Sequence, residues 1–147
     1  MAVDNLELAI ANMFALFPLV QRKIMKPENL ECHDGLSHSH FQIIYILNVF
    51  GILPVSEIAN KMAISRSNMT PLIDKLIKEE LVQRLPSEQD RRIINIALTD
   101  YGRKFLEEHQ KTIMNYLRKR LSCLADEDLI QLAVSFENIK KVFSKLS

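Results

Sequence analysis

The chain has 147 residues, of which 48% are hydrophobic, and its formal net charge at pH 7 is +1. This length suits one domain or two small lobes that share a core. No apolar run approaches the length of a membrane-spanning helix, and residues 1–5 lack the features of a signal peptide. Two cysteines, Cys32 and Cys123, are too few for a disulfide framework. We therefore expect a cytoplasmic protein with no membrane partner.

The first predicted helix runs from about Asn5 to Met25 and is apolar over much of its surface. Pro18 should bend this helix or remove one of its backbone hydrogen bonds. The apolar stripe is broader than a surface helix of a single domain needs, which indicates a core helix, a subunit interface or both. Its members are Leu6, Ala9, Ile10, Met13, Phe14, Phe17, Val20 and Ile24.

A loop from Lys26 to Ser37 precedes a second predicted helix, which begins near Ser37 or Ser39 and ends at Phe50. Apolar residues cover most of this helix, so we expect it to lie centrally. Gly51 is well placed to stop the helix. One buried face should contain Ile43, Ile46, Leu47 and Phe50, and Phe41, Ile44 and Tyr45 begin a neighbouring stripe.

Two short helices joined by a tight turn are predicted after Pro54. The first runs from about Val55 to Met62, and residues 63–64 make the turn. Ser65 or Ser67 caps the second helix, because a serine oxygen accepts a hydrogen bond from an unpaired backbone N–H. The stripe of this helix that faces the core consists of Met69, Leu72, Ile73, Leu76 and Ile77.

The opposite face of this second helix carries short polar groups near its start and cations further along. Short polar groups at a helix N-terminus are suited to reading base edges, and cations to contacting phosphates. Pro71 removes one helical hydrogen bond, at little cost if Ser67 is the cap. The candidate DNA-binding residues of this helix are Ser65, Arg66, Ser67, Asn68, Thr70 and Lys75.

Two strand-like runs follow, from Val82 to Pro86 and from Ile93 to Leu98. In the second run, Ile94, Ile96 and Leu98 should share one face, with Asn95 on the other. The polar loop between the runs carries Asp90, Arg91 and Arg92, and arginines at a hairpin tip suit a narrow minor groove.

We add Asp90, Arg91 and Arg92 to the candidate DNA-binding set. In an extended wing, residues two apart share one side, so Asp90 could hold the guanidinium of Arg92 in place. Arg91 would then face the other way, nearer to a phosphate. A surface ion pair of little consequence is the alternative interpretation.

Two further helices complete the chain. Thr99 should cap a long helix from Asp100 to about Leu124, and a short break at residues 125–128 precedes the last one. An apolar terminal helix normally docks on another surface. The apolar stripe of the last helix consists of Leu129, Leu132, Ala133, Phe136, Ile139, Phe143 and Leu146.

Helix, turn, helix and hairpin in this order form the layout of a winged helix-turn-helix. Asp90-Arg91-Arg92, then five residues, then Leu98-Thr99-Asp100-Tyr101-Gly102 resembles the wing-to-helix signature of the MarR family of bacterial transcription regulators. There are two departures from the family pattern. Glu80 stands where the family usually has Gly, and Pro71 stands where many members have Arg or Lys.

The resemblance implies a mainly α fold with a small β-hairpin wing. A winged helix-turn-helix DNA-binding lobe would span residues 51–104, and a helical dimerisation lobe would span 1–50 and 105–147. The implied function is a homodimeric, sequence-specific regulator, most often a repressor released by a small-molecule effector. Its partners would be a second copy of the chain, a pseudo-palindromic double-stranded DNA operator and the effector.

The resemblance also implies an effector pocket between the two lobes. Its walls would be Phe14, Phe17, Phe41, Tyr45 and Tyr101. Ordinary core packing is the alternative interpretation of these aromatic residues.

Two sensing mechanisms remain alternatives. Cys32, His33, His38, His40 and His109 are residue types that bind zinc, but their spacing matches no compact site, so we predict no metal and no cofactor. In the hydroperoxide-sensing branch of the family, a reactive cysteine follows a run like Phe14–Phe17 here, and this chain has none at that place. Cys32 could still be reactive in its loop, whereas Cys123 is expected to be a small buried or interface residue.

The sequence contains no nucleophile elbow, phosphate-binding loop or zinc-protease motif, so we do not expect an enzyme. A winged helix used only for protein–protein contacts is the rival interpretation from a different functional class.

Overall fold

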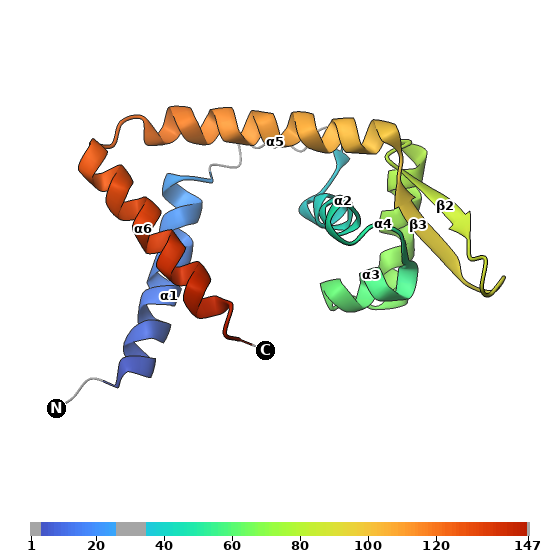
Figure 1. Cartoon of the computed structure of the whole chain (residues 1–147), viewed down its shortest axis with the longest axis horizontal. Helices are drawn as coiled ribbons and strands as arrows, with labels where there is room; N and C mark the ends of the chain where they lie inside the picture. Colours follow the sequence, from blue (N-terminus) through green and yellow to red (C-terminus); the bar gives the residue numbers. More distant parts are fainter. Residues whose placement is uncertain (1–3, 26–34, 147) are drawn as a thin grey trace. The chain divides into compact units, whose positions relative to one another are not determined.

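The computed structural model describes residues 4–25 and 35–146 of the chain. The described part is mostly helical, with a small antiparallel sheet, and this confirms the mainly α fold with a wing (Figure 1). The elements in chain order are α1 (Asn5–Lys23), α2 (His38–Phe50), β1 (Leu53–Pro54), α3 (Val55–Met62), α4 (Arg66–Lys78), β2 (Val82–Pro86), β3 (Ile94–Leu98), α5 (Asp100–Leu121) and α6 (Asp126–Phe143).

The chain forms two compact units, and α5 contributes to both. The first unit consists of Met1–Leu30 and Ile113–Ser147, and the second is Glu31–Thr112. The boundaries expected from the sequence, at 50/51 and 104/105, differ from this division. Helix α2 belongs with the second unit because Ile43 and Ile44 are buried in the core of that unit. Periodicity shows that a helix is buried, but it does not show which unit buries it.

The second unit has a single closed core. Side chains from α2, α3, α4, the sheet and the start of α5 meet there, and most of them are almost completely inaccessible to solvent. Burial of this apolar surface is the main force that holds the unit together. The buried core residues are Leu36, Ile43, Ile44, Leu47, Ile58, Ala59, Met69, Ile73, Leu76, Leu81, Val82, Ile96, Leu98 and Leu106.

The sheet has three strands in the order β1-β3-β2, one more than the predicted hairpin. Strand β1 has only two residues, and Leu53 pairs with Ile96. Strand β3 runs from Ile94 to Leu98, so Ile94, Ile96 and Leu98 share one face as predicted, but Ile94 is 48% exposed whereas Ile96 and Leu98 are buried. Ile94 pairs with Pro86 towards the hairpin loop, beyond the reach of the core.

Helix α2 is capped at both ends. Its N-cap is Ser37, and the backbone N–H of Ser37 donates to Nδ1 of His40 at 2.8 Å. The ring of His40 is buried, and burial lowers its pKa, with a smaller contribution from the positive charge of Lys75. Gly51 ends the helix with φ of 79°, the left-handed region expected of a stop glycine.

The end of α4 meets the start of α5 at Leu81. Glu80 adopts a φ of 60°, so the turn into the wing forms with Glu where the family usually has Gly. Thr99 Oγ1 donates to the Glu80 carbonyl at 2.6 Å and accepts from the Gly102 N–H at 2.9 Å, which confirms Thr99 as the cap of α5. A Cβ on Gly102 would lie 2.0 Å from the Leu81 carbonyl oxygen. Only glycine permits this approach.

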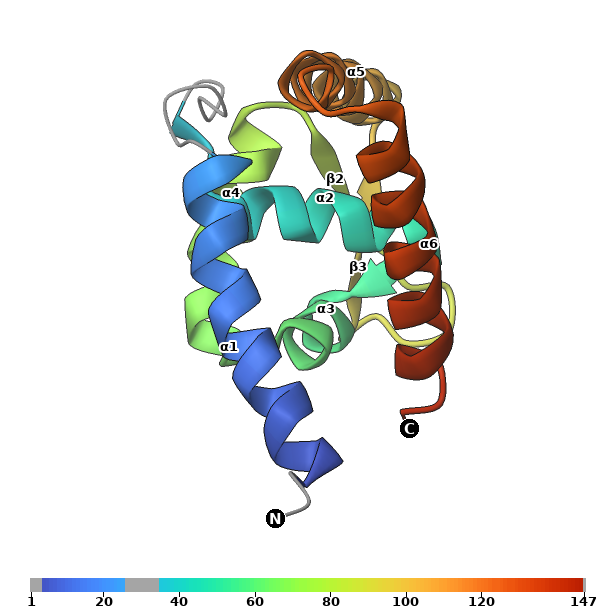
Figure 2. The same cartoon turned by 90° about the vertical axis from the view of Figure 1, so that its left-hand side faces the viewer.

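The first unit has a different character. None of the described residues of α1 or α6 is buried, and the two helices stand apart in Figure 2. Helix α5 holds the C-terminal end of α1, because Tyr116 Oη donates to the Ile24 carbonyl and Arg120 Nε donates to the Lys23 carbonyl, each at 2.7 Å. The large apolar side chains that α1 exposes are Leu6, Leu8, Ile10, Met13, Phe14, Leu16, Phe17 and Leu19.

Candidate nucleic-acid interface

The start of α4 is fixed by a serine cap. Of the two candidates, Ser65 is the N-cap, and its Oγ accepts from the Asn68 N–H at 3.3 Å. The Ser67 hydroxyl lies 3.2 Å from that of Ser65. Serine is a strong N-cap because its oxygen satisfies a backbone N–H that has no helical partner. The cap leaves Arg66, Ser67 and Asn68 exposed in the first turn of α4.

With Ser65 as the cap, Pro71 lies in the second turn of α4 and not in the first. It therefore removes a hydrogen bond that the helix would otherwise make to the Ser67 carbonyl. One residue earlier, Thr70 Oγ1 donates back to the Arg66 carbonyl at 3.1 Å. The polar start of α4 thus has two side chains, Ser65 and Thr70, bonded to its backbone and lacks one helical backbone bond.

A cleft of about 260 Å³ brings α4, the start of α3 and the wing together. Arg66 and Thr70 line it from α4, and Arg92 lines it from the wing loop. Two guanidinium groups that flank one cleft favour an anion such as a backbone phosphate. The remaining lining residues are Pro54, Val55, Ser56, Ile93 and Ile94, none of which sequence reasoning assigned to the site.

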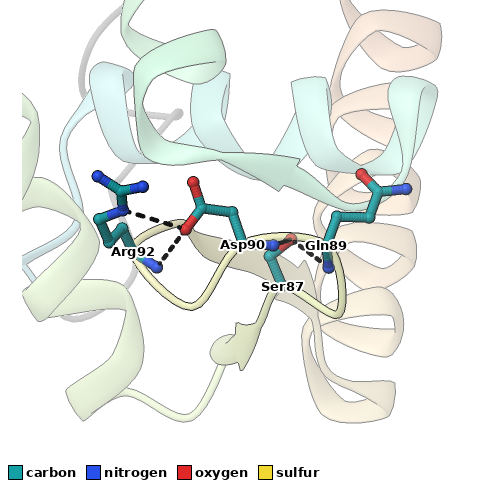
Figure 3. Close-up of polar contacts among 4 residues, drawn as sticks. All are labelled: Ser87, Gln89, Asp90 and Arg92. Carbon is teal, nitrogen blue, oxygen red and sulfur yellow. Dashed lines mark hydrogen bonds and ion pairs between the residues drawn. The ribbon is translucent and has the colours of Figure 1, made fainter.

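The wing loop is a compact turn and not an extended tip (Figure 3). Ser87 Oγ accepts from the backbone N–H groups of Gln89 and Asp90, at 3.3 and 3.4 Å. Asp90 Oδ1 accepts from the backbone N–H of Arg92 at 2.9 Å and lies 3.4 Å from its Nε. The expected pairing of Asp90 with Arg92 is confirmed, but the extended geometry proposed for it is wrong.

The exposure of the Arg92 side chain limits what its ion pair with Asp90 contributes. The Arg92 side chain is 91% exposed, so the ion pair contributes little to folding and leaves most of the guanidinium donors directed at solvent. Asp90 orders the turn mainly through the backbone N–H. Arg91 is also exposed.

Lys75 is less available to DNA than the sequence indicated. Its Nζ lies 2.7 Å from Glu79 Oε1, and its side chain is only 33% exposed. This pair holds the pKa of the Glu79 carboxyl below its usual value, first through the hydrogen bond and then through the charge of Lys75. A phosphate contact from Lys75 would have to compete with Glu79.

A second ion pair joins α4 to the wing, and sequence reasoning did not find it. Arg84 Nη2 on β2 lies 2.5 Å from Asp74 Oδ1 on α4. The spacing of Arg66, Thr70 and Asp74 places all three on one stripe of α4, but it does not identify Arg84 as the partner.

The five aromatic residues expected to line an effector pocket are divided between the two units. Phe14 and Phe17 lie in α1, and both are exposed, as are Tyr45 and Tyr101 in the second unit. Phe41 is half-buried and stacks on His109, with ring centroids 4.0 Å apart. Ordinary core packing therefore describes Phe41 only, and the pocket stays a prediction.

The sensing residues are only partly described. Cys32 and His33 lie outside the described residues. Within residues 4–25 and 35–146, no three His, Cys, Asp or Glu side chains are grouped so that they could hold a metal ion. Cys123 was expected to be buried or at an interface; within the chain it is exposed, and its Sγ donates to the Arg120 carbonyl at 3.3 Å.

Comparison with known proteins gives the chain a family. The MarR family model matches residues 36–94, which span the capped α2, the helix-turn-helix and most of the wing. YpoP of Bacillus subtilis, an uncharacterised HTH-type transcriptional regulator, is 33% identical over 124 residues, covering 82% of this chain and 88% of YpoP. The chain belongs to the MarR family.

Two further proteins are similar to the chain. The transcriptional repressor MdtR of B. subtilis is 33% identical over 121 residues, covering 81% of this chain and 75% of MdtR. The crystal structure of B. subtilis YusO superposes with a TM-score of 0.74 at 28% identity, covering 95% of this chain and 99% of YusO. This MarR-family chain is thus a DNA-binding transcriptional regulator and not an enzyme. Among its described residues, no helix is long and apolar enough to span a membrane.

Proposed function

We propose that the protein is a homodimeric repressor that binds a pseudo-palindromic operator through α4 and the wing. The observation that carries the proposal is the cleft that Arg66 and Arg92 line from two different elements. A cleft of this kind admits one backbone phosphate and fixes the register of the protein on the duplex.

Base readout then belongs to the exposed first turns of α4. Ser67, Asn68 and Thr70 carry short polar groups that reach base edges when a recognition helix enters the major groove N-terminus first. The remaining proposed contacts are Ser65, Arg66, Lys75, Asp90, Arg91 and Arg92. Of these, Arg92 is proposed to reach into the minor groove beside the phosphate that the cleft holds, because most of its guanidinium is exposed and its turn is ordered by Asp90.

The proposed dimer rests on α1 and α6. Both helices expose large apolar side chains along their length, and neither has a buried residue among those described. Apolar surface of this extent marks a protein–protein interface. In a two-fold dimer the two recognition helices contact half-sites about one helical turn apart, roughly 34–36 Å.

Repression released by a small molecule is the regulatory part of the proposal. MdtR is named as a repressor, which supports the sign of regulation proposed here. Phe14, Phe17, Phe41, Tyr45 and Tyr101 are the aromatic side chains proposed to contact an effector. A redox response through Cys32, or a metal response, would replace the effector without changing the DNA contacts.

The test is recovery of genomic fragments by the purified protein, followed by gel shift with the recovered sequence and with random duplex. We expect an enriched, two-fold symmetric sequence that binds one dimer, with dimer mass measured by light scattering. Absence of any enriched sequence would favour a winged helix used only for protein contacts. A monomer at micromolar concentration would reject the proposed assembly.

A further inference from the structure

The ion pair between Asp74 and Arg84 joins two elements that both belong to the proposed DNA surface. Asp74 lies on α4 and Arg84 lies on β2, with Oδ1 and Nη2 2.5 Å apart. Each of the other ion pairs found within residues 4–25 and 35–146 joins residues at most four apart in the sequence. Those pairs act within one helix or loop, whereas this one links the recognition helix to the wing.

The pair lies next to the cleft. Arg66, Thr70 and Asp74 follow one another at intervals of four residues, so they share a stripe of α4. The first two line the cleft, and Asp74 lies one turn further along. On the wing, Arg84 pairs with Ile96, two residues closer to the base of the hairpin than the cleft residue Ile94. The ion pair therefore lies beyond the cleft on both elements, further along α4 and closer to the base of the hairpin.

We propose that Asp74 and Arg84 are positioning residues for DNA recognition. Their ion pair holds the wing at the angle to α4 that keeps Arg66 and Arg92 on the two walls of one cleft. Arg84 acts through Asp74 and does not contact the DNA. This inference rests on the DNA-binding function proposed above.

Two physical features carry the proposal. Both side chains are about half exposed, at 55% for Asp74 and 50% for Arg84, so the pair adds little to the free energy of folding. A carboxylate on the DNA-facing stripe also repels phosphates and opposes binding unless it has another role. The pair can fix the angle between α4 and the wing without adding much to the free energy of folding. The gain in DNA binding from that fixed angle would offset the repulsion between Asp74 and the phosphates.

Substitution of Asp74 separates this role from a direct contact by Arg84. If Arg84 binds a phosphate and Asp74 merely competes for it, Asp74→Asn frees Arg84 and removes a negative charge, so affinity for all DNA rises. If the pair positions the wing, Asp74→Asn lowers affinity for the operator in spite of the favourable change in charge. The two interpretations predict opposite signs.

The experiment compares the full-length dimer with its Asp74→Asn, Arg84→Gln and charge-swapped Asp74→Arg/Arg84→Asp variants. The probes are the duplex recovered by the wild type from genomic DNA and a random duplex of equal length. We expect operator affinity to fall about two- to fivefold in each single variant and to recover in the swap. Random-duplex affinity should be unchanged or higher in Asp74→Asn.

The matched control is Glu108→Gln on α5. It makes the same change in charge and breaks the exposed pair with Lys111, away from the cleft. Its ratio of operator to random affinity should equal that of the wild type. Tighter operator binding by Asp74→Asn would overturn the proposal. So would equal losses of operator and random binding by Arg84→Gln with a smaller salt dependence, since that pattern marks a phosphate contact.

A second measurement does not depend on DNA. Hydrogen exchange of the β2 and β3 amides should be faster in Asp74→Asn than in Glu108→Gln, because the wing loses its link to α4. Unchanged exchange in the wing would reject the positioning role. If the wild type binds no DNA at all, the proposed function fails, and the exchange result alone decides whether the pair holds the wing.

Discussion

The two units of the chain bury their apolar side chains in different ways. In Glu31–Thr112, residues such as Ile58 and Leu76 are completely buried within one chain, whereas in the other unit Phe14 is 79% exposed. The second unit has a closed core even though side chains such as Phe50 and Ile52 stay exposed, whereas α1 and α6 of the first unit have no buried residue among those described. We therefore expect the first unit to fold by association, while the winged unit needs no partner to close its core.

The largest expected effect comes from a charge on the exposed apolar stripe of α1. Met13→Asp places a carboxylate where we propose that a second chain packs, and burying it unpaired costs several kcal/mol. We expect loss of the dimer and of operator binding, measured by light scattering and gel shift. The β-sheet core of the winged unit should keep its hydrogen-exchange protection.

The control for this variant is Asn12→Asp, which adds a carboxylate at an exposed polar position of the same helix. Adjacent helical residues point about 100° apart, so residue 12 lies to one side of the stripe that contains Met13. The change keeps the size of the side chain, and this variant should remain a dimer. If Met13→Asp also stays dimeric, α1 is not part of the interface.

Arg92→Ala should have the opposite effect to Met13→Asp. It should weaken DNA binding by the winged unit and leave the dimer intact. Loss of the exposed guanidinium should cost about 1–3 kcal/mol of operator binding free energy if it contacts a base edge in the minor groove. The dimer and the melting temperature should stay nearly unchanged, because Arg92 makes only a weak ion pair with Asp90. Fluorescence anisotropy with A·T-rich and G·C-rich flanks measures the effect.

Arg91→Ala is the comparison for Arg92→Ala, since the two residues are adjacent and both are exposed. Arg91 should affect all sequences alike through a phosphate. Wild-type operator affinity in Arg92→Ala at physiological salt would remove the wing from the DNA contacts.

Gly102→Ala tests the joint between α4 and α5 within the winged unit. The added Cβ would lie 2.0 Å from the Leu81 carbonyl oxygen, so the backbone must shift. We expect a loss of about 1–3 kcal/mol in unfolding free energy, as for other overpacked sites. Urea denaturation measures this loss.

Ala125→Gly, at the exposed N-cap of α6 in the other unit, should change stability far less. Equal stability of Gly102→Ala and the wild type would contradict the close approach.

Sequence reasoning located some features well and missed others for physical reasons. Helix α3 runs from Val55 to Met62 as predicted, because its apolar period and the turn that follows are local signals. Strand β1 was missed, since two residues show no period, and pairing with β3 is what makes them a strand. An element that forms only by pairing with a segment distant in sequence gives little local signal from which it could be predicted.

The same distinction applies to the candidate interface. The serine cap, the exposed start of α4 and the Asp90–Arg92 pair were predicted from local chemistry. The ion pair between Asp74 and Arg84 and the cleft lined by Ser56 were not, because they depend on how α3, α4 and the wing pack. Lys75 was assigned to phosphate from its face alone, although its spacing of four residues from Glu79 is a sequence signal for the ion pair that the structure shows.

Acid should weaken the winged unit through His40, whose ring is buried in that unit. The pKa of His40 is lowered in the fold, mainly by burial, so the unfolded chain binds this proton more tightly. Stability is therefore fully present above pH 6.5, the usual value for His, and falls as the pH drops below it.

Urea denaturation between pH 8 and pH 5 measures this loss. His40→Gln is the matched control, since glutamine at this capping position can still accept from the Ser37 N–H but does not titrate. Its stability should depend less on pH than that of the wild type. An identical pH dependence in the two proteins would show that His40 is not the responsible group.

The smallest expected effect is a gain in stability from Glu80→Gly. Glu80 holds a left-handed φ of 60° at the turn from α4 into the wing, which costs a residue with a Cβ about 1 kcal/mol. Glycine removes that cost but gives the unfolded chain more freedom, so the net gain should be a fraction of it. The carbonyl of residue 80 still accepts from Thr99 Oγ1, because the backbone of the turn is kept.

Glu88→Gly in the wing loop is the control, because Glu88 is not among the described non-glycine residues with positive φ. It should lower stability or leave it unchanged. A loss of stability in Glu80→Gly as large as in Glu88→Gly would mean that the turn is not strained, and that the winged unit tolerates Glu at residue 80 without a cost.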